Sequence, residues 1–475
     1  MSRQVVTAAN GAGEASQAGY AASAMSNAPR MPIVAIIGRP NVGKSTLFNR
    51  FAGHRRALVA DTPGLTRDRI AESLEIAGRR IWLVDTAGLD PDAELGLEAA
   101  VQAQAESAIR DADAVFFVVD GKAGLLPQDE SIARTLRKTQ KPLLLAVNKI
   151  DQPQRHADRV HEFHQLGLEP IHGVSGEHGG GAFDALEALV EQLPSDSDER
   201  DASAEDGALR IAIVGRPNVG KSSLTNRVLG QNRVVVSAEA GTTRDAIDVH
   251  FQQGEHAYVF VDTAGLRRPG RREGTGERVG ALMAVRALER AQVALLVLDA
   301  DQGPVDQDAH VARMISDLGR AVVIVANKWD QVAVEDRAEV KERIAHALRF
   351  LVEAPLVTLS ALTGAGVRRL LPAVAQVAQA AAQRIPTADF NRWLQDVVAR
   401  NPPGMSRKGK GRLPIKFQYG SQVGIGPPTF VLFCTEPDGL PAAYARFLEN
   451  QLRAQFGFEG TPLKILIRKR KRSED

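Results

Sequence analysis

Residues 38–45 read Gly38-Arg39-Pro40-Asn41-Val42-Gly43-Lys44-Ser45, and the same eight residues recur as Gly215-Arg216-Pro217-Asn218-Val219-Gly220-Lys221-Ser222. An apolar run precedes each octet and a helical pattern follows it. Glycines at this spacing let the backbone curl around phosphates with its N–H groups pointing inward, and the helix N-terminus adds positive potential. The sequence therefore predicts two phosphate-binding loops.

The repetition extends beyond these loops. Asp85-Thr86-Ala87-Gly88 recurs as Asp262-Thr263-Ala264-Gly265, and Asn148-Lys149-Ile150-Asp151 recurs as Asn327-Lys328-Trp329-Asp330. The period has the size of a domain, so it indicates a duplicated domain and not a solenoid of short repeats.

Composition shifts suggest where the domains begin and end. Residues 1–30 are rich in small and polar types, and structure is expected to begin at Met31. Either Met31 is the true start, or residues 1–30 are a dispensable tail. The expected segments are a disordered tail at 1–30, a first domain at 31–193, an acidic linker at 194–208, a second domain at 209–383, a third domain at 384–470 and a basic tail at 471–475.

Short apolar runs alternate with helical stretches inside each copy. The predicted strands of the first copy are 33–37, 81–84, 115–119 and 143–147. This alternation predicts an α/β fold with a mostly parallel sheet covered by helices on both faces. One antiparallel pair is expected, with 73–76 and 80–84 joined by a turn at Ala77-Gly78.

The overall composition is that of a soluble globular chain. Of 475 residues, 44% are apolar and 24% charged, and the single Cys434 excludes an internal disulfide. No apolar run is long enough for a membrane span, and a single Cys fits a reducing compartment, so we expect a cytoplasmic, monomeric protein without membrane attachment. Residues 384–475 carry 16 Lys and Arg against 8 Asp and Glu, which suggests a polyanionic partner for that end.

The residues of the first copy suit a magnesium-dependent triphosphate site. Lys44 is expected at the β- and γ-phosphates, and the Ser45 hydroxyl on magnesium. Asp85, at the end of an apolar strand, is expected in the second coordination shell of the magnesium ion. The Thr66 hydroxyl would complete the magnesium shell only when GTP is bound. The N–H of Gly88 can reach the γ-phosphate. The equivalents in the second copy are Lys221, Ser222, Asp262, Thr243 and Gly265.

The Asn-Lys-x-Asp motifs predict selection of guanine. Asp151 and Asp330 can each accept two hydrogen bonds from the N1–H and N2–H groups of guanine, which adenine lacks. We expect the asparagine of each motif to tether the loop and the lysine to lie along the base. The backbones at Ser175 and Ser360 could contact the base oxygen, although a plain loop remains an alternative there.

The predicted nucleotide contacts comprise these motifs and their neighbours. In the first copy they are Gly38, Arg39, Pro40, Asn41, Val42, Gly43, Lys44, Ser45, Thr46, Asp85, Thr86, Ala87, Gly88, Leu89, Asn148, Lys149, Ile150, Asp151 and Ser175. In the second they are Gly215, Arg216, Pro217, Asn218, Val219, Gly220, Lys221, Ser222, Ser223, Asp262, Thr263, Ala264, Gly265, Leu266, Asn327, Lys328, Trp329, Asp330 and Ser360.

Taken together, the two octets, the two Asp-Thr-Ala-Gly-Leu turns and the Pro-Pro-Thr-Phe-Val-Leu-Phe stretch of the third domain resemble the Der (EngA) family of bacterial tandem GTPases. The resemblance covers nearly all of residues 31–470. It implies a role in assembly of the large ribosomal subunit, with the ribosome or its RNA as partner. It also implies a C-terminal KH-like domain lodged between the two GTPase domains.

Hydrolysis must proceed without the glutamine that many small GTPases place after Asp-x-x-Gly, because that position is Leu89 or Leu266. In similar GTPases an asparagine of the phosphate loop coordinates potassium, and Asn41 and Asn218 hold that position. We therefore expect GTP and GDP, magnesium and also potassium as ligands. A tolerated asparagine in a tight loop is the alternative. Lys44, Thr66 and Asn41, with Lys221, Thr243 and Asn218, are the candidate catalytic residues.

The third domain reads as helix 384–401, strands 415–419 and 429–434, helix 444–456 and strand 463–467, an order that fits a KH-like domain. Its single Gly-x-x-Gly, residues 457–460, lies between a helix and a strand and not between two helices, which argues against KH-style reading of RNA. Contact with a phosphate backbone through residues 468–472 is expected instead, with a solubilising charged end as the alternative.

Other readings remain open. The chain could be a nucleotide-dependent scaffold in which one site binds GTP and barely turns over, or an ATP-using enzyme, which the Asn-Lys-x-Asp motifs disfavour. The arginine-rich segment 267–278 is either a partner contact or a solvated loop. His156, His161 and His164 are expected to form a wet helix face and not a metal site.

Overall fold

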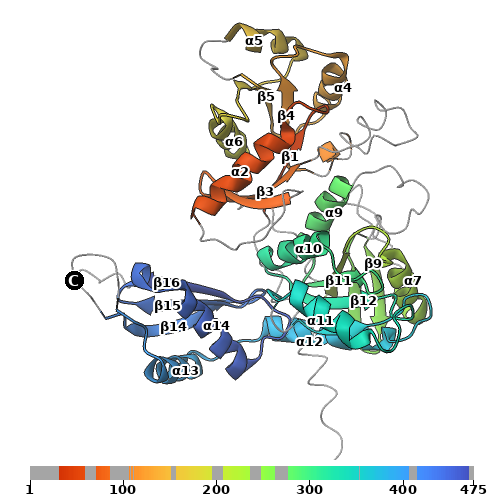
Figure 1. The fold of residues 1–475 in the computed structure, drawn as a ribbon, viewed down its shortest axis with the longest axis vertical. Helices are drawn as coiled ribbons and strands as arrows, with labels where there is room; N and C mark the ends of the chain where they lie inside the picture. Colours follow the sequence, from red (N-terminus) through yellow and green to blue (C-terminus); the bar gives the residue numbers. More distant parts are fainter. Residues whose placement is uncertain are drawn as a thin grey trace, which may run out of the picture. The chain divides into compact units, whose positions relative to one another are not determined.

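The computed structural model describes residues 31–58, 71–85, 106, 108–110, 112–150, 157–194, 207–235, 248–262, 277–351, 354–405 and 414–469. The chain divides into two compact units, whose helices and strands are labelled in Figure 1. One unit contains the first α/β domain together with residues 277–289 of the second copy, and the other contains the rest of the second α/β domain and the third domain.

The first domain has a six-stranded sheet in the order β2-β3-β1-β4-β5-β6. Its strands are β1 (Ile33–Ile37), β2 (Ala71–Ile76), β3 (Arg79–Asp85), β4 (Ala114–Asp120), β5 (Leu143–Asn148) and β6 (Ile171–Gly173). Its helices are α2 (Lys44–Leu58), α4 (Pro127–Leu136), α5 (Ala157–His161), η1 (Glu162–Leu166) and α6 (Ala182–Glu191). The β2–β3 pair is antiparallel and the other pairs are parallel, which confirms the predicted fold class and the predicted antiparallel pair.

Burial explains why these runs form central strands. Every residue of β1 and β4 is buried, so both faces of the sheet are covered. Phe48 of α2 and Leu186 of α6 pack with Ile36 and Phe116 on one face, while Ile132 of α4 is buried as well. Continuous apolar runs are the pattern expected of parallel strands, whose two faces both lack contact with water.

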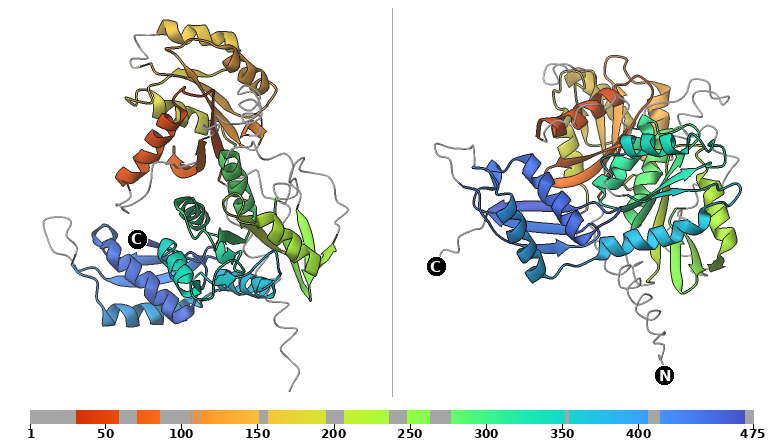
Figure 2. Two further views of the ribbon diagram at one scale, coloured as in Figure 1. Left: turned by 45° about the vertical axis from the view of Figure 1, so that its right-hand side comes forward. Right: turned by 60° about the horizontal axis from the view of Figure 1, so that its bottom comes forward.

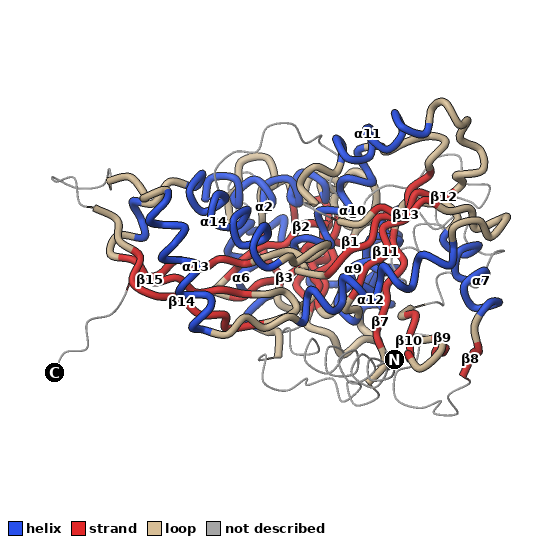
Figure 3. Tube along the Cα trace, turned by 90° about the horizontal axis from the view of Figure 1, so that it is seen from below, coloured by secondary structure: helices blue, strands red, loops and turns tan. Residues whose placement is uncertain are grey.

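The second domain repeats this plan with one extra edge strand. Its sheet has the order β13-β12-β11-β7-β10-β9-β8, antiparallel only at β8-β9-β10 (Figure 3). The strands are β7 (Leu209–Val214), β8 (Arg233–Val235), β9 (Val249–Gln253), β10 (His256–Phe260), β11 (Val293–Asp299), β12 (Ala321–Asn327) and β13 (Leu356–Thr358). The helices are α7 (Lys221–Gln231), α9 (Glu277–Arg290), α10 (Asp306–Asp317), α11 (Arg337–Ala347), η3 (Val367–Arg369) and α12 (Leu370–Ala382).

The third domain follows α12 after a short connection (Figure 2). It consists of α13 (Thr387–Arg400), β14 (Phe417–Gly424), β15 (Thr429–Cys434), η4 (Pro437–Gly439), α14 (Ala442–Phe456) and β16 (Lys464–Lys469). The predicted α–β–β–α–β order is confirmed. Phe390 and Leu394 of α13 pack with Leu448 of α14 against Phe430 and Leu432, and Cys434 is buried in β15 as expected.

The Gly-x-x-Gly segment lies between α14 and β16, where the sequence placed it, and it packs against the second domain. The Val322 N–H of β12 donates to the Gly460 carbonyl at 2.7 Å. A Cβ on Gly460 would lie 2.6 Å from a methyl carbon of Val377 in α12. This segment therefore joins two domains within one unit. Among the described helices, none is long and apolar enough to span a membrane.

Candidate nucleotide-binding sites

Both phosphate-binding loops connect a buried strand to a helix. Residues 38–43 join β1 to α2, and residues 215–220 join β7 to α7. The two loops share one backbone shape, with φ of 65° at Asn41 and 61° at Asn218. This left-handed conformation is one that asparagine tolerates better than most residues. The loops thus lie at the carboxyl ends of parallel strands, where open α/β sheets bind ligands.

The lysine of each loop is held inside it. The Lys44 ammonium donates to the carbonyl oxygens of Gly38 at 2.7 Å and Arg39 at 2.6 Å. Lys221 makes the equivalent pair of bonds, both at 2.7 Å. The loop carbonyls therefore keep the positive charge where the amides of the loop would gather phosphate oxygens.

The asparagine of each Asn-Lys-x-Asp motif ties the phosphate loop to the segment that begins at Ser175 or Ser360, called the base-contact segment after its predicted role. The Asn148 side chain donates to the Val42 carbonyl at 2.8 Å and accepts from the Gly176 N–H at 2.8 Å. A Cβ on Gly43 would lie 2.3 Å from the Asn148 Nδ2 atom, so this glycine makes room for the amide. Asn327 makes the same two bonds in the second domain, at 2.8 and 2.9 Å.

Ser175 and Ser360 are buried at the start of these base-contact segments. The Ser175 hydroxyl accepts the His178 N–H at 3.2 Å, and the Ser360 hydroxyl accepts the Thr363 N–H at 3.1 Å. Each hydroxyl thus closes a tight turn after a strand. The structure places both serines next to the motif asparagines, and their role toward the base stays a prediction.

An arginine of the first helix supports each of these turns, and sequence reasoning missed it. The Arg50 Nε donates to the Gly176 carbonyl at 2.6 Å, and the Arg227 Nε donates to the Ala361 carbonyl at 2.9 Å. The two arginines stand 177 residues apart, the offset of the phosphate loops. This shared offset is the signal that could have revealed them.

The residues predicted near magnesium differ between the domains. In the first, the Ser45 hydroxyl donates to the Asp85 carboxylate at 2.7 Å. A hydroxyl and a carboxylate are oxygen ligands that magnesium accepts, so this pair fits the ion. In the second, β10 ends at Phe260, and Asp262 has a φ of 53° while its N–H donates to Asp248 at 3.1 Å.

A buried carboxylate holds the arginine of each phosphate loop, a contact that the sequence analysis missed. Asp129 accepts from Arg39 Nε at 3.3 Å and from the Leu126 N–H at 3.2 Å, which caps α4. Asp308 lies 3.4 Å from Arg216 Nε. Burial raises the pKa of both carboxyl groups above the usual range, and the arginines oppose the shift.

The described part of the second domain contains a pocket at its base-contact motif. It combines residues of the phosphate loop, the Asn-Lys-x-Asp motif and the Ser-Ala segment. The lining residues are Gly220, Ser223, Asn327, Lys328, Asp330, Gln331, Ser360, Ala361 and Leu362. Six of these were predicted contacts, and Ala361 follows Ser360 in the stretch whose backbone is predicted to contact the base. Gln331 and Leu362 are additions that only the folded chain reveals.

Several predicted residues lie outside the described residues. In the first domain they are Thr66, Thr86, Ala87, Gly88, Leu89 and Asp151, and in the second Thr243, Thr263, Ala264, Gly265 and Leu266. The segments 1–30 and 471–475, His156 and most of 267–278 lie outside them as well. Among the described residues no group of three or more His, Cys, Asp or Glu could hold a metal ion. The rings of His161 and His164 lie with their centroids 5.6 Å apart, tilted by 33°.

The paired loops, each tied by an asparagine to a base-contact segment, define a tandem GTPase. A family model described as 50S ribosome-binding GTPase matches residues 33–149 and again 210–328. A second model, the KH-domain-like C-terminal region of EngA bacterial GTPase enzymes, matches residues 384–468.

The chain belongs to the GTPase Der (EngA) family. It is 45% identical over 440 residues to GTPase Der of Moorella thermoacetica, covering 92% of this chain and 98% of that relative. It is 46% identical over 446 residues to GTPase Der of Symbiobacterium thermophilum, covering 93% of both chains. The chain is therefore a GTP-binding enzyme that hydrolyses GTP.

Solved structures of other GTPases align with parts of the chain. Aquifex aeolicus Era bound to GDP and AlF4− is 22% identical, covers 55% of this chain and 94% of that chain, and has a TM-score of 0.28. The G domain of the Thermotoga maritima FeoB iron transporter is 29% identical, covers 34% of this chain and 98% of that chain, and has a TM-score of 0.26. At these scores neither alignment bears on the assignment.

Proposed function

We propose that both GTPase domains bind and hydrolyse GTP and that the chain acts in assembly of the large ribosomal subunit. The proposal of two nucleotide sites is supported by the asparagine tether. Asn148 and Asn327 each join a phosphate loop to a base-contact segment with the same pair of hydrogen bonds. Competition of labelled GTP by excess ATP tests guanine selection. Equal displacement by both nucleotides would contradict it.

The predicted residues would divide the work at each site. Lys44 and Lys221 bind the β- and γ-phosphates, and Asp151 and Asp330 accept the donor edge of guanine. Magnesium, when bound, neutralises charge on the phosphates. Its ligands and neighbours in the first site would be Ser45, Thr66 and Asp85, and in the second Ser222, Thr243 and Asp262.

The attacking water needs a partner other than glutamine, because Leu89 and Leu266 are apolar. Asn41 and Asn218 lie in the phosphate loops with the left-handed backbone described above. We propose that their side chains hold a potassium ion at the phosphates. Equal turnover in sodium and potassium buffers would contradict this assignment.

The ribosomal part of the proposal rests on the family descriptions and on charge. The phosphate-loop domains match a family described as ribosome-binding, and the third domain matches a KH-like one. Residues 384–475 carry twice as many basic as acidic residues, so contact with an RNA backbone should weaken with salt. Co-sedimentation with ribosomal subunits, in GDP and in a non-hydrolysable GTP analogue, tests this.

A second candidate is a scaffold in which one site binds GTP with little turnover. A difference between the two sites supports this candidate. In the first site Ser45 bonds to Asp85, whereas in the second the backbone of Asp262 is left-handed. Single-turnover rates of the Lys44→Ala and Lys221→Ala variants separate the candidates. Comparable residual rates in the two variants would exclude the scaffold.

A further inference from the structure

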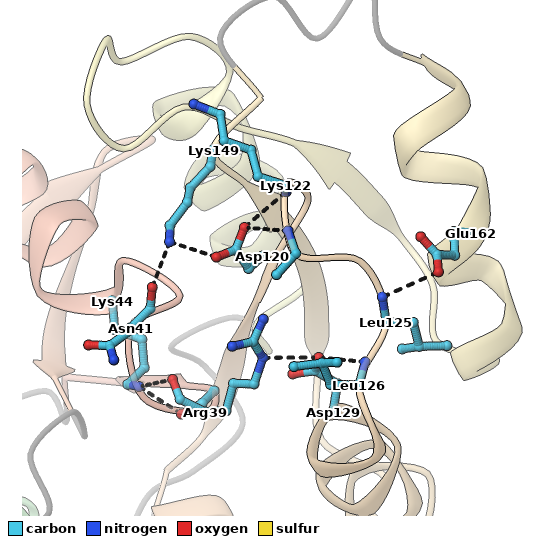
Figure 4. Close-up of polar contacts among 12 residues, drawn as sticks. Arg39, Asn41, Lys44, Asp120, Lys122, Leu125, Leu126, Asp129, Lys149 and Glu162 are labelled. Atoms are coloured by element: carbon cyan, nitrogen blue, oxygen red, sulfur yellow. Dashed lines mark hydrogen bonds and ion pairs between the residues drawn. The ribbon is translucent and has the colours of Figure 1, made fainter.

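An aspartate that belongs to no predicted motif contacts the lysine of the first base-recognition motif. Asp120 is the last residue of β4 and is buried. Its carboxylate accepts from the Lys149 ammonium at 2.6 Å and from the backbone N–H groups of Lys122 at 2.9 Å and Ala123 at 3.2 Å (Figure 4). The carboxylate therefore binds the side chain that is expected to lie along guanine.

Strand register explains this contact. In the parallel β4–β5 pair Asp120 lies opposite Asn148, so the next residue, Lys149, leaves the sheet beside the carboxylate. Lys149 has a left-handed backbone, with φ of 67°. Its ammonium also donates to the Asn41 carbonyl of the phosphate loop at 2.7 Å. One ammonium thus connects three segments: the end of β4, the base motif and the phosphate loop.

The charge state of Asp120 suits this contact. Burial alone would raise the pKa of Asp120, but the hydrogen bonds from Lys149 and from two backbone N–H groups hold it below its usual value. The carboxylate stays charged at neutral pH, and charge-assisted hydrogen bonds are about twice as strong as neutral ones.

The second domain repeats the contact with a different loop sequence. Asp299, the last residue of β11, lies opposite Asn327 and accepts from the Lys328 ammonium at 2.6 Å. The N–H groups of Asp301 and Gln302 donate to it at 3.1 and 3.3 Å. The three residues after the aspartate are Gly-Lys-Ala in one domain and Ala-Asp-Gln in the other, yet the contact recurs.

We propose that Asp120 and Asp299 are positioning residues for guanine nucleotides: each holds the lysine of its Asn-Lys-x-Asp motif in the place where the lysine meets the base. The inference rests on the proposed guanine role of those motifs. An ammonium on a four-carbon side chain has many rotamers, and fixing it before the base arrives lowers the entropy lost on binding. The effect should be larger at Asp120, because Lys149 also holds the phosphate loop.

The test is the affinity for a fluorescent GDP derivative, measured on the full chain. In a Lys221→Ala background, in which the remaining tight binding belongs to the first site, Asp120→Asn should weaken GDP binding about 10- to 100-fold. Lys149→Met should weaken it to a similar extent. The double variant should bind no worse than the weaker single variant, because Asp120 acts through Lys149.

One conservative variant and one control separate positioning from folding. Asp120→Glu keeps the charge and should retain most of the affinity for GDP. Asp184→Asn removes an exposed acid from α6 and should bind GDP as tightly as the parent. If Asp120→Asn does not fold, Asp299→Asn in a Lys44→Ala background should likewise weaken GDP binding, by a smaller factor. Thermal unfolding of each nucleotide-free variant shows which ones fold.

The outcomes distinguish the inference from the proposed function. Unchanged GDP binding in folded Asp120→Asn and Asp299→Asn, or effects of Asp120→Asn and Lys149→Met that multiply, would overturn the positioning role alone. Unchanged binding in both Lys149→Met and Asp151→Asn would overturn the proposed guanine site itself.

Discussion

The two GTPase domains share their loops but differ in what surrounds them. Both have the same phosphate loop, the same asparagine tether and the same aspartate–lysine contact. In the first, Ser45 bonds to Asp85, whereas in the second the backbone of Asp262 turns into the left-handed region. Identical motifs therefore do not guarantee identical backbones: β3 ends at Asp85 itself, whereas β10 ends at Phe260, two residues before Asp262.

The domains also differ in their attachment to the rest of the chain. The second domain shares a compact unit with the third, joined where β12 begins, at the Val322–Gly460 bond. This attachment lies at the opposite end of β12 from Asn327, whose side chain bonds to the Val219 carbonyl of the phosphate loop. The asparagine tether and the attachment of the third domain thus use the two ends of one strand.

The largest expected effect comes from the phosphate-loop lysines. Lys44→Ala and Lys221→Ala should each lower turnover at their own site about 10²- to 10³-fold, the usual cost of losing a group that stabilises transition-state charge. Phosphate release by each variant, compared with the parent, ranks the two sites. Full activity in both variants would refute the assignment of the loops.

The second glycine of each loop gives the next largest effect. Gly43→Ala places a Cβ against the Asn148 amide and should weaken nucleotide binding at the first site about 100-fold. Gly53→Ala, in α2 with open space around it, is the matched control and should stabilise by up to about 1 kcal/mol.

The pair Gly220→Ala and Gly230→Ala makes the same comparison in the second domain. Isothermal titration of GDP gives the affinities. A larger loss in one domain than in the other would show that the tether matters unequally, and no loss in either would contradict the asparagine argument.

The attachment of the third domain can be broken separately. Gly460→Ala meets Val377 and the Val322 carbonyl and should destabilise the unit by about 2–3 kcal/mol. Gly457→Ala has open space around its Cβ, so it should carry only the backbone cost of its φ of 85° and ψ of −113°, about 1–3 kcal/mol, with no cost of packing.

The three tryptophans report on this attachment, since Trp82, Trp329 and Trp393 lie in the first, second and third domains. In single-tryptophan chains unfolded with urea, the Trp329 and Trp393 transitions should coincide in the parent and separate in Gly460→Ala. Equal behaviour of the Gly457 and Gly460 variants would show that packing at Gly460 contributes nothing.

The smallest effect is expected from acid. Because the folded-state pKa of Asp120 lies below its unfolded value, the ionised carboxylate contributes stability above pH 3.8, and this is lost as the pH falls through the folded pKa. Asp120→Asn should lose less thermal stability than the parent between pH 5 and pH 3, by about 2–4 °C. Melting of the first domain, followed by Trp82 fluorescence, measures it. If the melting temperatures of Asp120→Asn and of the parent fall equally with pH, Asp120 does not contribute to acid destabilisation.

Much of the fold could be predicted because its signals are local. Continuous apolar runs identified the buried strands, and the Ala77-Gly78 turn identified the antiparallel pair. The KH-like domain was implied by the family resemblance, and the order of elements fitted it. The extra edge strand β8 was missed because three residues, Arg233–Val235, carry too little pattern. Arg50 and Arg227 were missed because an arginine on a helix looks like any solvated residue until its carbonyl partner is known.

The sequence by itself determined the duplicated phosphate cradles, the guanine motifs and the three-domain order, because each is written in residues close together along the chain. Only the tertiary structure decided the partners of Asp120, Asp129 and their counterparts. Asp120 meets Lys149 and Asp129 meets Arg39 across 29 and 90 residues. Parallel strands bring such segments to one edge of a sheet, and their register, set by packing on both faces, selects which side chains meet there.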